Sequence, residues 1–174
     1  AISKLDNLSN SSESDVKSIL IKLAQKDEKS SVRGNAIEKL GKLFNDEDLL
    51  EIYKNASNDK SYEVSAQALT TLYEKNAEMG FEEAKQFEGD SSSAMLNALL
   101  RIFSASGSDA ENNFFIEKER FFNSYGKYSY AQLYGKYLLG RSDSVINSGL
   151  PLLEKTYLNS SIWWVRLVTL QAID

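Results

Sequence analysis

The sequence predicts an all-α protein built from repeated pairs of antiparallel helices. Along most of the chain, apolar residues recur at the three- and four-residue spacing of an amphipathic helix, and no segment shows the alternation typical of a half-buried strand. One helix pattern, preceded by an aspartate, returns at a period of about 30 residues. Because a single amphipathic unit cannot bury its own apolar face, we expect the repeated units to stack on one another.

The clearest copy of the repeat spans residues 27–43, where the apolar side chains share one helical face. A second copy begins about 32 residues later, a looser third lies near residues 94–102, and a fourth lies near the C-terminus. The matching positions are Asp27, Val32, Ala36, Ile37, Leu40 and Leu43 in the first copy; Asp59, Val64, Ala68, Leu69 and Leu72 in the second; Ala94, Ala98, Leu99 and Ile102 in the third; and Val165 and Arg166, which restore the Val32–Arg33 pair, in the last.

Apolar spacing and capping residues predict about five helix pairs in order along the chain. Pro151 falls inside one of these helices, where proline costs about 3 kcal/mol, so we expect a kink or a restart there. The first pair begins after Ser12 or Ser14, with Val16, Ile19, Leu20 and Leu23 buried, and ends with 32–44; the second begins at Glu47 or Asp48 and ends with 62–75; the third covers 81–87 and 91–103; the fourth covers 110–123 and 128–139; the fifth begins at Ser142 or Asp143 and ends with a helix from Ile162 onward.

This pattern predicts a right-handed α-α superhelix of the HEAT or armadillo type, forming a single domain over 13–174. Tetratricopeptide repeats have a similar period, but their Trp, Leu-Gly, Tyr and Pro positions find no match in this sequence. Residues 1–12 end in a polar, serine-rich run. We expect them to be a partly disordered N-terminal segment or the remnant of an upstream helix.

Composition and charge exclude several classes of function. The net charge of −5 and the lack of a basic stripe argue against a nucleic-acid partner, because such binding depends on Lys and Arg neutralising phosphates. No stretch approaches the roughly 20 apolar residues of a membrane span. We therefore expect a soluble protein with neither a nucleic-acid nor a membrane partner.

The sequence holds neither His nor Cys. This excludes an HExxH zinc site, a Ser/His/Asp triad and a thiol nucleophile within the chain. Phosphate-binding Gly-rich loops and EF-hand patterns are also missing. Acidic clusters such as 46–48 lie at expected helix starts, where carboxylates favour the helix dipole. We expect no catalytic, cofactor-binding or metal-binding residue in this chain, and no enzymatic activity from it alone.

Two arginines, Arg33 and Arg166, fall in the first turn of an expected helix, where the macrodipole disfavours a cation. Asp27 is placed to pair with Arg33, and Asp59 to extend a ladder of ion pairs between neighbouring repeats. Ser65 replaces the arginine in the second copy, so the ladder is incomplete. The alternative, that these arginines bind a ligand, is the less favoured interpretation.

The densest aromatic region lies between residues 114 and 137. Phe114, Phe121 and Phe122, at helical spacing, are expected in the core. Two interpretations remain open for Tyr128, Tyr130 and Tyr134: they pack in the core, or they form a surface that receives a peptide or a partner domain, since Tyr supplies contact area at low entropic cost.

The last helix is apolar on nearly every face, and it contains both tryptophans of the chain, Trp163 and Trp164. A helix of this kind is normally covered on every side. We therefore expect at least one of these two indoles to contact another chain or another segment of polypeptide.

The segments Asp59–Val64 with Ala66, Ala68 and Leu69, Ser31–Arg33, and Trp164–Leu167 together resemble the C-terminal helical-repeat domain of bacterial zinc metallopeptidases of the aminopeptidase N family. The resemblance covers the chain from about residue 12 onward. In that family this domain is a superhelical bowl that packs on the catalytic domain and closes over its active site.

This resemblance implies a non-catalytic domain of a zinc aminopeptidase that restricts peptide access to the active site. Its partner would be the catalytic domain of the same parent protein, which carries the zinc, and peptide substrates would be met only indirectly. A bacterial cytoplasm or periplasm is the implied location. The alternative is a stand-alone HEAT-repeat adaptor that binds a protein or peptide in its concave groove.

Overall fold

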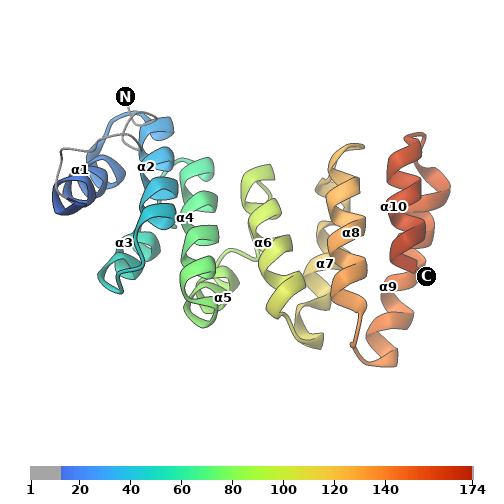
Figure 1. Cartoon of the computed structure of the whole chain (residues 1–174). Coiled ribbons are helices and arrows are strands. Elements are labelled where there is room, and N and C mark those ends of the chain that lie inside the picture. The colour runs from blue at the N-terminus through green and yellow to red at the C-terminus, as the bar shows by residue number, and fades with distance from the viewer. Residues whose placement is uncertain (1–12, 174) are drawn as a thin grey trace. The chain divides into compact units, whose positions relative to one another are not determined.

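The structure, a computed structural model, describes residues 13–173 (Figure 1). All regular structure in this range is helical, which confirms the all-α prediction. The expectation for residues 1–12 lies outside the described residues. The α-helices are α1 Glu13–Lys26, α2 Ser30–Leu43, α3 Asp48–Ala56, α4 Tyr62–Lys75, α5 Ala77–Lys85, α6 Ser93–Ser106, α7 Asn112–Lys118, α8 Gly126–Leu138, α9 Asp143–Asn159 and α10 Trp163–Ile173; the 3-10 helices η2 Asp109–Glu111 and η3 Glu119–Phe121 flank α7.

The helices group into two compact units. The first unit contains α1 to α5 and ends at Gln86, and the second begins at Phe87 and contains α6 to α10. The packing of helices is defined inside each unit. The superhelix expected over 13–174 stays a prediction.

In the first unit, α2 and α4 lie side by side, α1 packs on α2, and α3 and α5 pack on α4 (Figure 1). Arg33 near the start of α2 binds Asp59 just before α4, and Gly41 lies against Thr71 near the far ends of the two helices. The two helices therefore run parallel, as expected of equivalent helices in successive repeats.

The core of the first unit is formed by the apolar positions of the repeat. Ile19 and Leu43, which the sequence analysis placed in this core, are exposed. Because α1 packs along one side only, its buried stripe is one residue wide and passes through Val16, Leu20 and Ala24. The fully buried repeat positions are Ala36, Ile37, Leu40, Val64, Ala68, Leu69 and Leu72.

In the second unit, α6, α8 and α10 form one layer, and α9 packs on both α8 and α10. Its core is aromatic. The Phe115 ring stacks on Tyr134 and Tyr137, with centroid distances of 4.9 and 4.4 Å, and such ring pairs stabilise a core beyond the area they bury. Phe114 and Phe122 are buried as expected, but Phe121, in the 3-10 helix η3 rather than in α7, is exposed, and Lys118 and Arg120 contact its ring.

The recurring aspartate of the repeat shapes the turn that precedes α2, α4 and α6. In each copy its carboxylate accepts a hydrogen bond from the backbone N–H two residues later, which fixes the chain as it enters the helix. The three bonds join Asp27 to Lys29 at 2.9 Å, Asp59 to Ser61 at 2.8 Å and Asp90 to Ser92 at 2.6 Å.

Three helices differ from what the sequence predicted. The one expected over 110–123 is the shorter α7, between the 3-10 helices η2 and η3. The helix expected to start at Phe81 begins at Ala77, because the Asn76 side chain caps it by accepting the Met79 N–H at 3.0 Å. The helix that contains Pro151 runs from Asp143 to Asn159 without a restart. Pro151 and Asn147 are both exposed, so water can bind the carbonyl that the proline leaves without a donor.

Across residues 13–173 no helix combines the length and the apolar character needed to span a bilayer.

We predict that Ala68→Asp destabilises the first unit by several kcal/mol, on the order of 3. Ala68 is fully buried on α4, and an aspartate there would place a carboxylate among apolar side chains. Urea denaturation followed by circular dichroism measures the loss. Ala77→Asp is the matched control, because Ala77 is exposed in the first turn of α5, where a carboxylate favours the dipole. Equal stability of the two variants would show that the repeat register is wrong.

Candidate functional site

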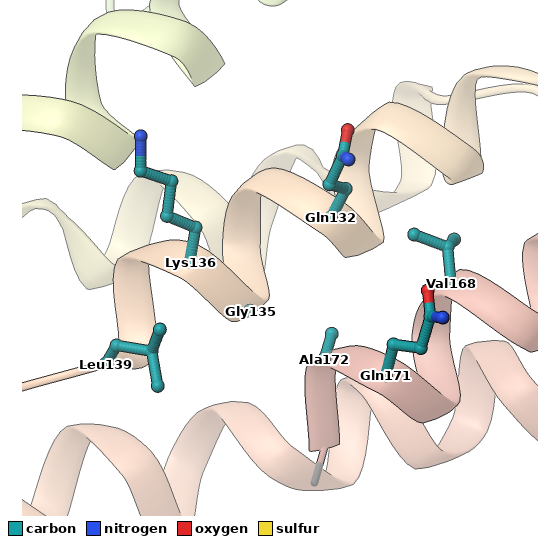
Figure 2. Close-up of a pocket in the computed structure, with 7 residues that line it drawn as sticks. All are labelled: Gln132, Gly135, Lys136, Leu139, Val168, Gln171 and Ala172. Atoms are coloured by element: carbon teal, nitrogen blue, oxygen red, sulfur yellow. The ribbon is translucent and has the colours of Figure 1, made fainter.

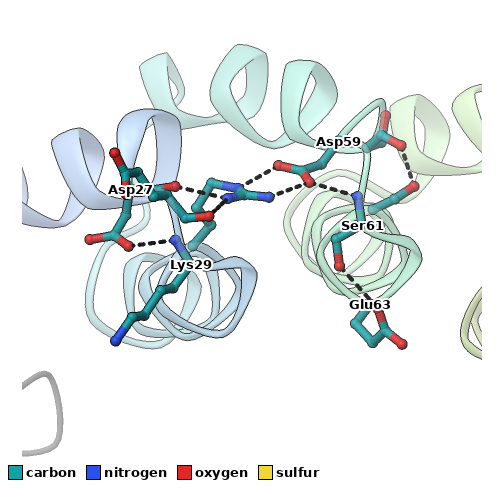
Figure 3. A network of polar contacts seen from close by, with 9 residues as sticks. Asp27, Lys29, Asp59, Ser61 and Glu63 are labelled. Atoms are coloured by element: carbon teal, nitrogen blue, oxygen red, sulfur yellow. Dashed lines mark hydrogen bonds and ion pairs between the residues drawn. The ribbon is translucent and has the colours of Figure 1, made fainter.

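The ladder expected from the sequence is a single buried ion pair between two repeats (Figure 3). The Arg33 guanidinium donates from Nε and Nη2 to the two carboxylate oxygens of Asp59, each at 2.7 Å. Its Nη1 donates to the backbone carbonyls of Asp27 and Glu28 at 2.8 and 3.1 Å. Asp27 thus meets Arg33 through its carbonyl, and its carboxylate accepts the Lys29 N–H.

This pair is chemically satisfied and nearly closed to solvent, with side-chain exposures of 6% for Arg33 and 14% for Asp59. The hydrogen bond from Arg33 lowers the pKa of the Asp59 carboxyl, and the same bond raises the pKa of Arg33. Two carbonyls and a carboxylate occupy the guanidinium, so Arg33 is a structural residue that joins α2 to the turn before α4.

Arg166 takes no part in a comparable pair. Its guanidinium lies 5.0 Å from the centre of the Tyr157 ring, a cation–π contact between α10 and α9, and no ion pair of Arg166 is found among residues 13–173. Arg166 therefore lies outside the ladder that was predicted for it, and instead makes a local contact inside the second unit.

The three tyrosines for which two interpretations were open lie in two different environments, core and surface. Tyr130 and Tyr134 are fully buried; their hydroxyls donate to the Phe115 carbonyl at 3.0 Å and to the Asn112 side chain at 2.9 Å. Burial raises the pKa of both phenols, so they remain protonated donors. Tyr128, on another face of α8, is exposed.

Both tryptophans are exposed to solvent. Trp163 is 68% exposed and Trp164 39%, and the Trp164 ring stacks on Tyr125, with ring centroids 6.2 Å apart. The same side of α10 as Trp163 carries Leu167 and Leu170, which are 48% and 42% exposed. Val165, Val168 and Thr169 on the opposite side are buried. The prediction that an indole contacts another polypeptide therefore stands as a prediction.

A groove lies between α8 and α10, in the second unit (Figure 2). We name it the α8–α10 groove. Its volume is about 280 Å³. Gln132 and Lys136 project from α8 toward the same side as Val168 and Gln171 of α10 (Figure 2). The groove is lined by Gln132, Gly135, Lys136, Leu139, Val168, Gln171 and Ala172.

The position of the groove follows from a close approach of the two helices. A Cβ atom on Gly135 would lie 2.4 Å from the Cβ of Ala172, so only glycine permits this contact. Tyr125 and Trp164 meet at the beginnings of the helices, whereas Gly135 and Ala172 meet near their ends. The helices therefore run parallel, and the groove follows them.

The exposed aromatic residues belong to the same surface as the groove. Tyr128 lies four residues before Gln132 on α8, and Trp164 lies four residues before Val168 on α10, so each shares a helical face with a residue that lines the groove. We call Tyr125, Tyr128 and Trp164 the aromatic end of the groove. Lys136, Gln132 and Gln171 form its polar end.

The polar end offers several groups for binding. Gln132 and Gln171 each present a carboxamide with donors and an acceptor. Lys136 is exposed, and among the described residues its ammonium forms no ion pair. Within residues 13–173 no cluster of acidic side chains is arranged to hold a metal ion. The arrangement suits reversible binding of a ligand with apolar, hydrogen-bonding and anionic groups.

The sequence analysis identified Tyr128 and Trp164 as candidate contacts but missed Gln132, Lys136 and Gln171. These three residues look like ordinary solvated positions on two separate helices. The available signal was Gly135, a glycine inside a helix pattern, which often marks a close approach of two backbones.

Comparison of the chain with models of protein families, with curated proteins and with solved structures finds no match.

We predict that Arg33→Met lowers the free energy of unfolding at pH 7 by about 3 kcal/mol, because it leaves the largely buried Asp59 carboxylate without its cation. Asp59→Asn, which keeps an acceptor for the Ser61 N–H, should lower the free energy of unfolding by a similar amount. The double variant should lose less stability than the sum of the two single losses. Urea denaturation measures all three. Lys17→Met is the control, since its partner Asp48 is 66% exposed, and it should change stability by less than about 1 kcal/mol.

The contribution of the pair should also depend on pH. The native pKa of Asp59 is lowered, so the stability that it provides is complete above its unfolded value of about 3.9 and is lost as the pH falls through the native pKa. The gap in stability between wild type and Arg33→Met should therefore shrink below about pH 4. A gap that stays constant down to pH 2 would contradict this account.

Proposed function

We propose that this chain is a non-catalytic helical-repeat domain that binds another polypeptide. The observation that carries this proposal is the α8–α10 groove, which is lined by two carboxamides and a lysine, together with the exposed rings of Tyr128 and Trp164, each one helical turn before a residue that lines the groove. Exposed aromatic side chains that adjoin a concave surface are typical of protein–protein contacts, where Trp and Tyr contribute much of the affinity. The net charge of −5 favours a polypeptide over a nucleic acid.

The surface is held on a rigid base, which supports a binding role. Beneath the groove, the buried hydroxyls of Tyr130 and Tyr134 tie α8 to the segment around α7, and Gly135 holds α8 against α10. A surface that is ordered before binding loses less conformational entropy when it meets its partner. The aromatic rings and the carboxamides therefore present a prepared surface rather than one that must form on contact.

The resemblance to the aminopeptidase N family gives this proposal a narrower form. In that form the bound polypeptide is a zinc-bearing catalytic domain of the same parent protein, and the chain restricts peptide access to its active site. Among the residues that carry the resemblance, Arg33, Asp59 and Val64 act in stacking α2 on α4. They support a repeat architecture, and they serve a covering domain and a stand-alone adaptor equally well.

The general proposal predicts that a phage-displayed library of random peptides yields binders to the folded chain. Trp164→Ala should weaken the selected peptides tenfold or more, because truncating a central aromatic contact typically has an effect of that size. Tyr62→Ala is the matched control, since Tyr62 is an exposed aromatic residue of the first unit, and it should leave binding unchanged. Failure to select any peptide, or equal loss in both variants, would contradict the proposal.

The narrower form predicts that the chain alone hydrolyses no aminoacyl anilide, with or without added zinc. The product of the complete reading frame should hydrolyse the anilide and lose this activity when zinc is chelated. Both proteins are assayed side by side under the same conditions. If neither shows activity, the narrower form is wrong and the adaptor form is retained.

A further inference from the structure

We propose that the α8–α10 groove binds an extended peptide segment in which an apolar side chain lies three or four residues from a carboxylate. This inference rests on the proposed polypeptide-binding function and specifies the partner's chemistry. In the complex, the aromatic end receives the apolar side chain and Lys136 receives the carboxylate.

The spacing follows from the length of α8. Tyr128 and Lys136 are separated by eight residues on the same side of this helix, which corresponds to about 12 Å along its axis. An extended chain advances about 3.3 Å per residue, so three or four residues cover that distance. Trp164 and Gln171 on α10 are seven residues apart, about 10 Å, and give the same range.

The carboxamides favour an extended ligand over a helical one. Gln132 on α8 and Gln171 on α10 flank the groove, and each can donate to a backbone carbonyl and accept from a backbone N–H. In an extended segment those backbone groups are free to bond, whereas a helix satisfies most of them internally. Val168, Ala172 and Leu139 supply the apolar part of the groove's lining.

The charge at the polar end favours a carboxylate. Lys136 lies in the last turn of α8, where its ammonium offsets the partial negative charge of the helix C-terminus. Lys136 is exposed, and among the described residues its ammonium forms no ion pair, so it is available to a carboxylate of the ligand. For an exposed pair of this kind the expected gain in affinity is modest, about two- to fivefold.

The test uses acetylated, amidated peptides with one Phe and one Glu in a Ser/Gly background, with the Glu placed one, three, four or seven positions from the Phe and in both orders. Trp163 and Trp164 are the only tryptophans of the chain, and Trp164 lies one helical turn before Val168, which lines the groove. Tryptophan emission therefore reports binding at this surface, and titrations yield dissociation constants. We expect the spacings of three and four to bind about two- to fivefold more tightly than the others, in at least one order.

Charge reversal tests the role of Lys136. For Lys136→Glu we expect the preference to switch from the Glu peptide to a Lys peptide of the same spacing. Lys155→Glu, an exposed position on α9 with the same change of charge, should keep the preference for Glu. Urea denaturation verifies that both variants fold. A preference that is unchanged in Lys136→Glu, or that changes equally in both variants, would overturn the inference.

Proline in the spacer separates an extended ligand from a helical one. An extended segment tolerates proline, and one proline removes only one backbone N–H, so proline placed at each spacer position in turn should leave at least one peptide that binds within about twofold of the parent. Loss of binding at every spacer position would indicate a helical ligand and overturn the inference, as would binding that Gln in place of Glu leaves unchanged.

The outcomes for the inference and for the proposed function are distinct. If the library yields peptides that depend on Trp164 but lack the spaced carboxylate, the inference fails and the polypeptide-binding function stands. If no library peptide and no designed peptide binds, both fail. Sedimentation measures self-association of the chain. If tryptophan emission changes with self-association and not with the peptide concentration, the inference is also overturned.

Discussion

The buried pair between Arg33 and Asp59 sets the constraint on which stacking in the first unit depends. Apolar faces alone allow one helix to slide along another, because hydrophobic contact has little directionality. A buried guanidinium that loses its carboxylate is far more costly than a shifted apolar contact. The bidentate pair at 2.7 Å therefore selects one register of α2 against α4, and the apolar positions from Ala36 to Leu72 interlock in that register.

The second unit solves the same problem with other groups. Lys118 of α7 donates to the Asp90 carbonyl at 2.8 Å, much as Arg33 donates to the Asp27 carbonyl, so a cation again satisfies the turn that leads into a helix of the layer. Register between α8 and α10 depends on shape, since Gly135 accepts Ala172 where any larger side chain would clash. Tyrosine hydroxyls then anchor α8 to α7 and its flanking turns. The surface of the groove is thus a consequence of how the layer is held together.

Local patterns predicted most of the helices, and contacts distant in sequence account for what was missed. Apolar spacing and turn residues lie within one helix, so they located α1 to α4, α6 and α8 to α10 closely. Tyr130, Tyr134 and Tyr137 are spaced as one helical stripe, whereas Tyr128 is not, and this difference could have separated core from surface. The groove could not be predicted, because it depends on α8 lying beside α10, and its polar residues resemble any solvated position until that pairing is known.

The buried polar groups also determine the pH range over which the fold persists. Burial raises the pKa of Tyr137 to about 12 and displaces the pKa of Tyr130 and Tyr134 upward as well. Groups with a raised native pKa stabilise the fold below their unfolded value, about 10, and lose that contribution as the pH rises through the native value. At the acidic end of the range, the lowered pKa of Asp59 has the opposite effect: its contribution to stability is lost as the pH falls through that pKa. Since the sequence contains no histidine, no side chain of ordinary pKa changes its charge between about pH 5 and pH 8, and the buried Asp59 carboxylate and tyrosine hydroxyls keep one protonation state over that range.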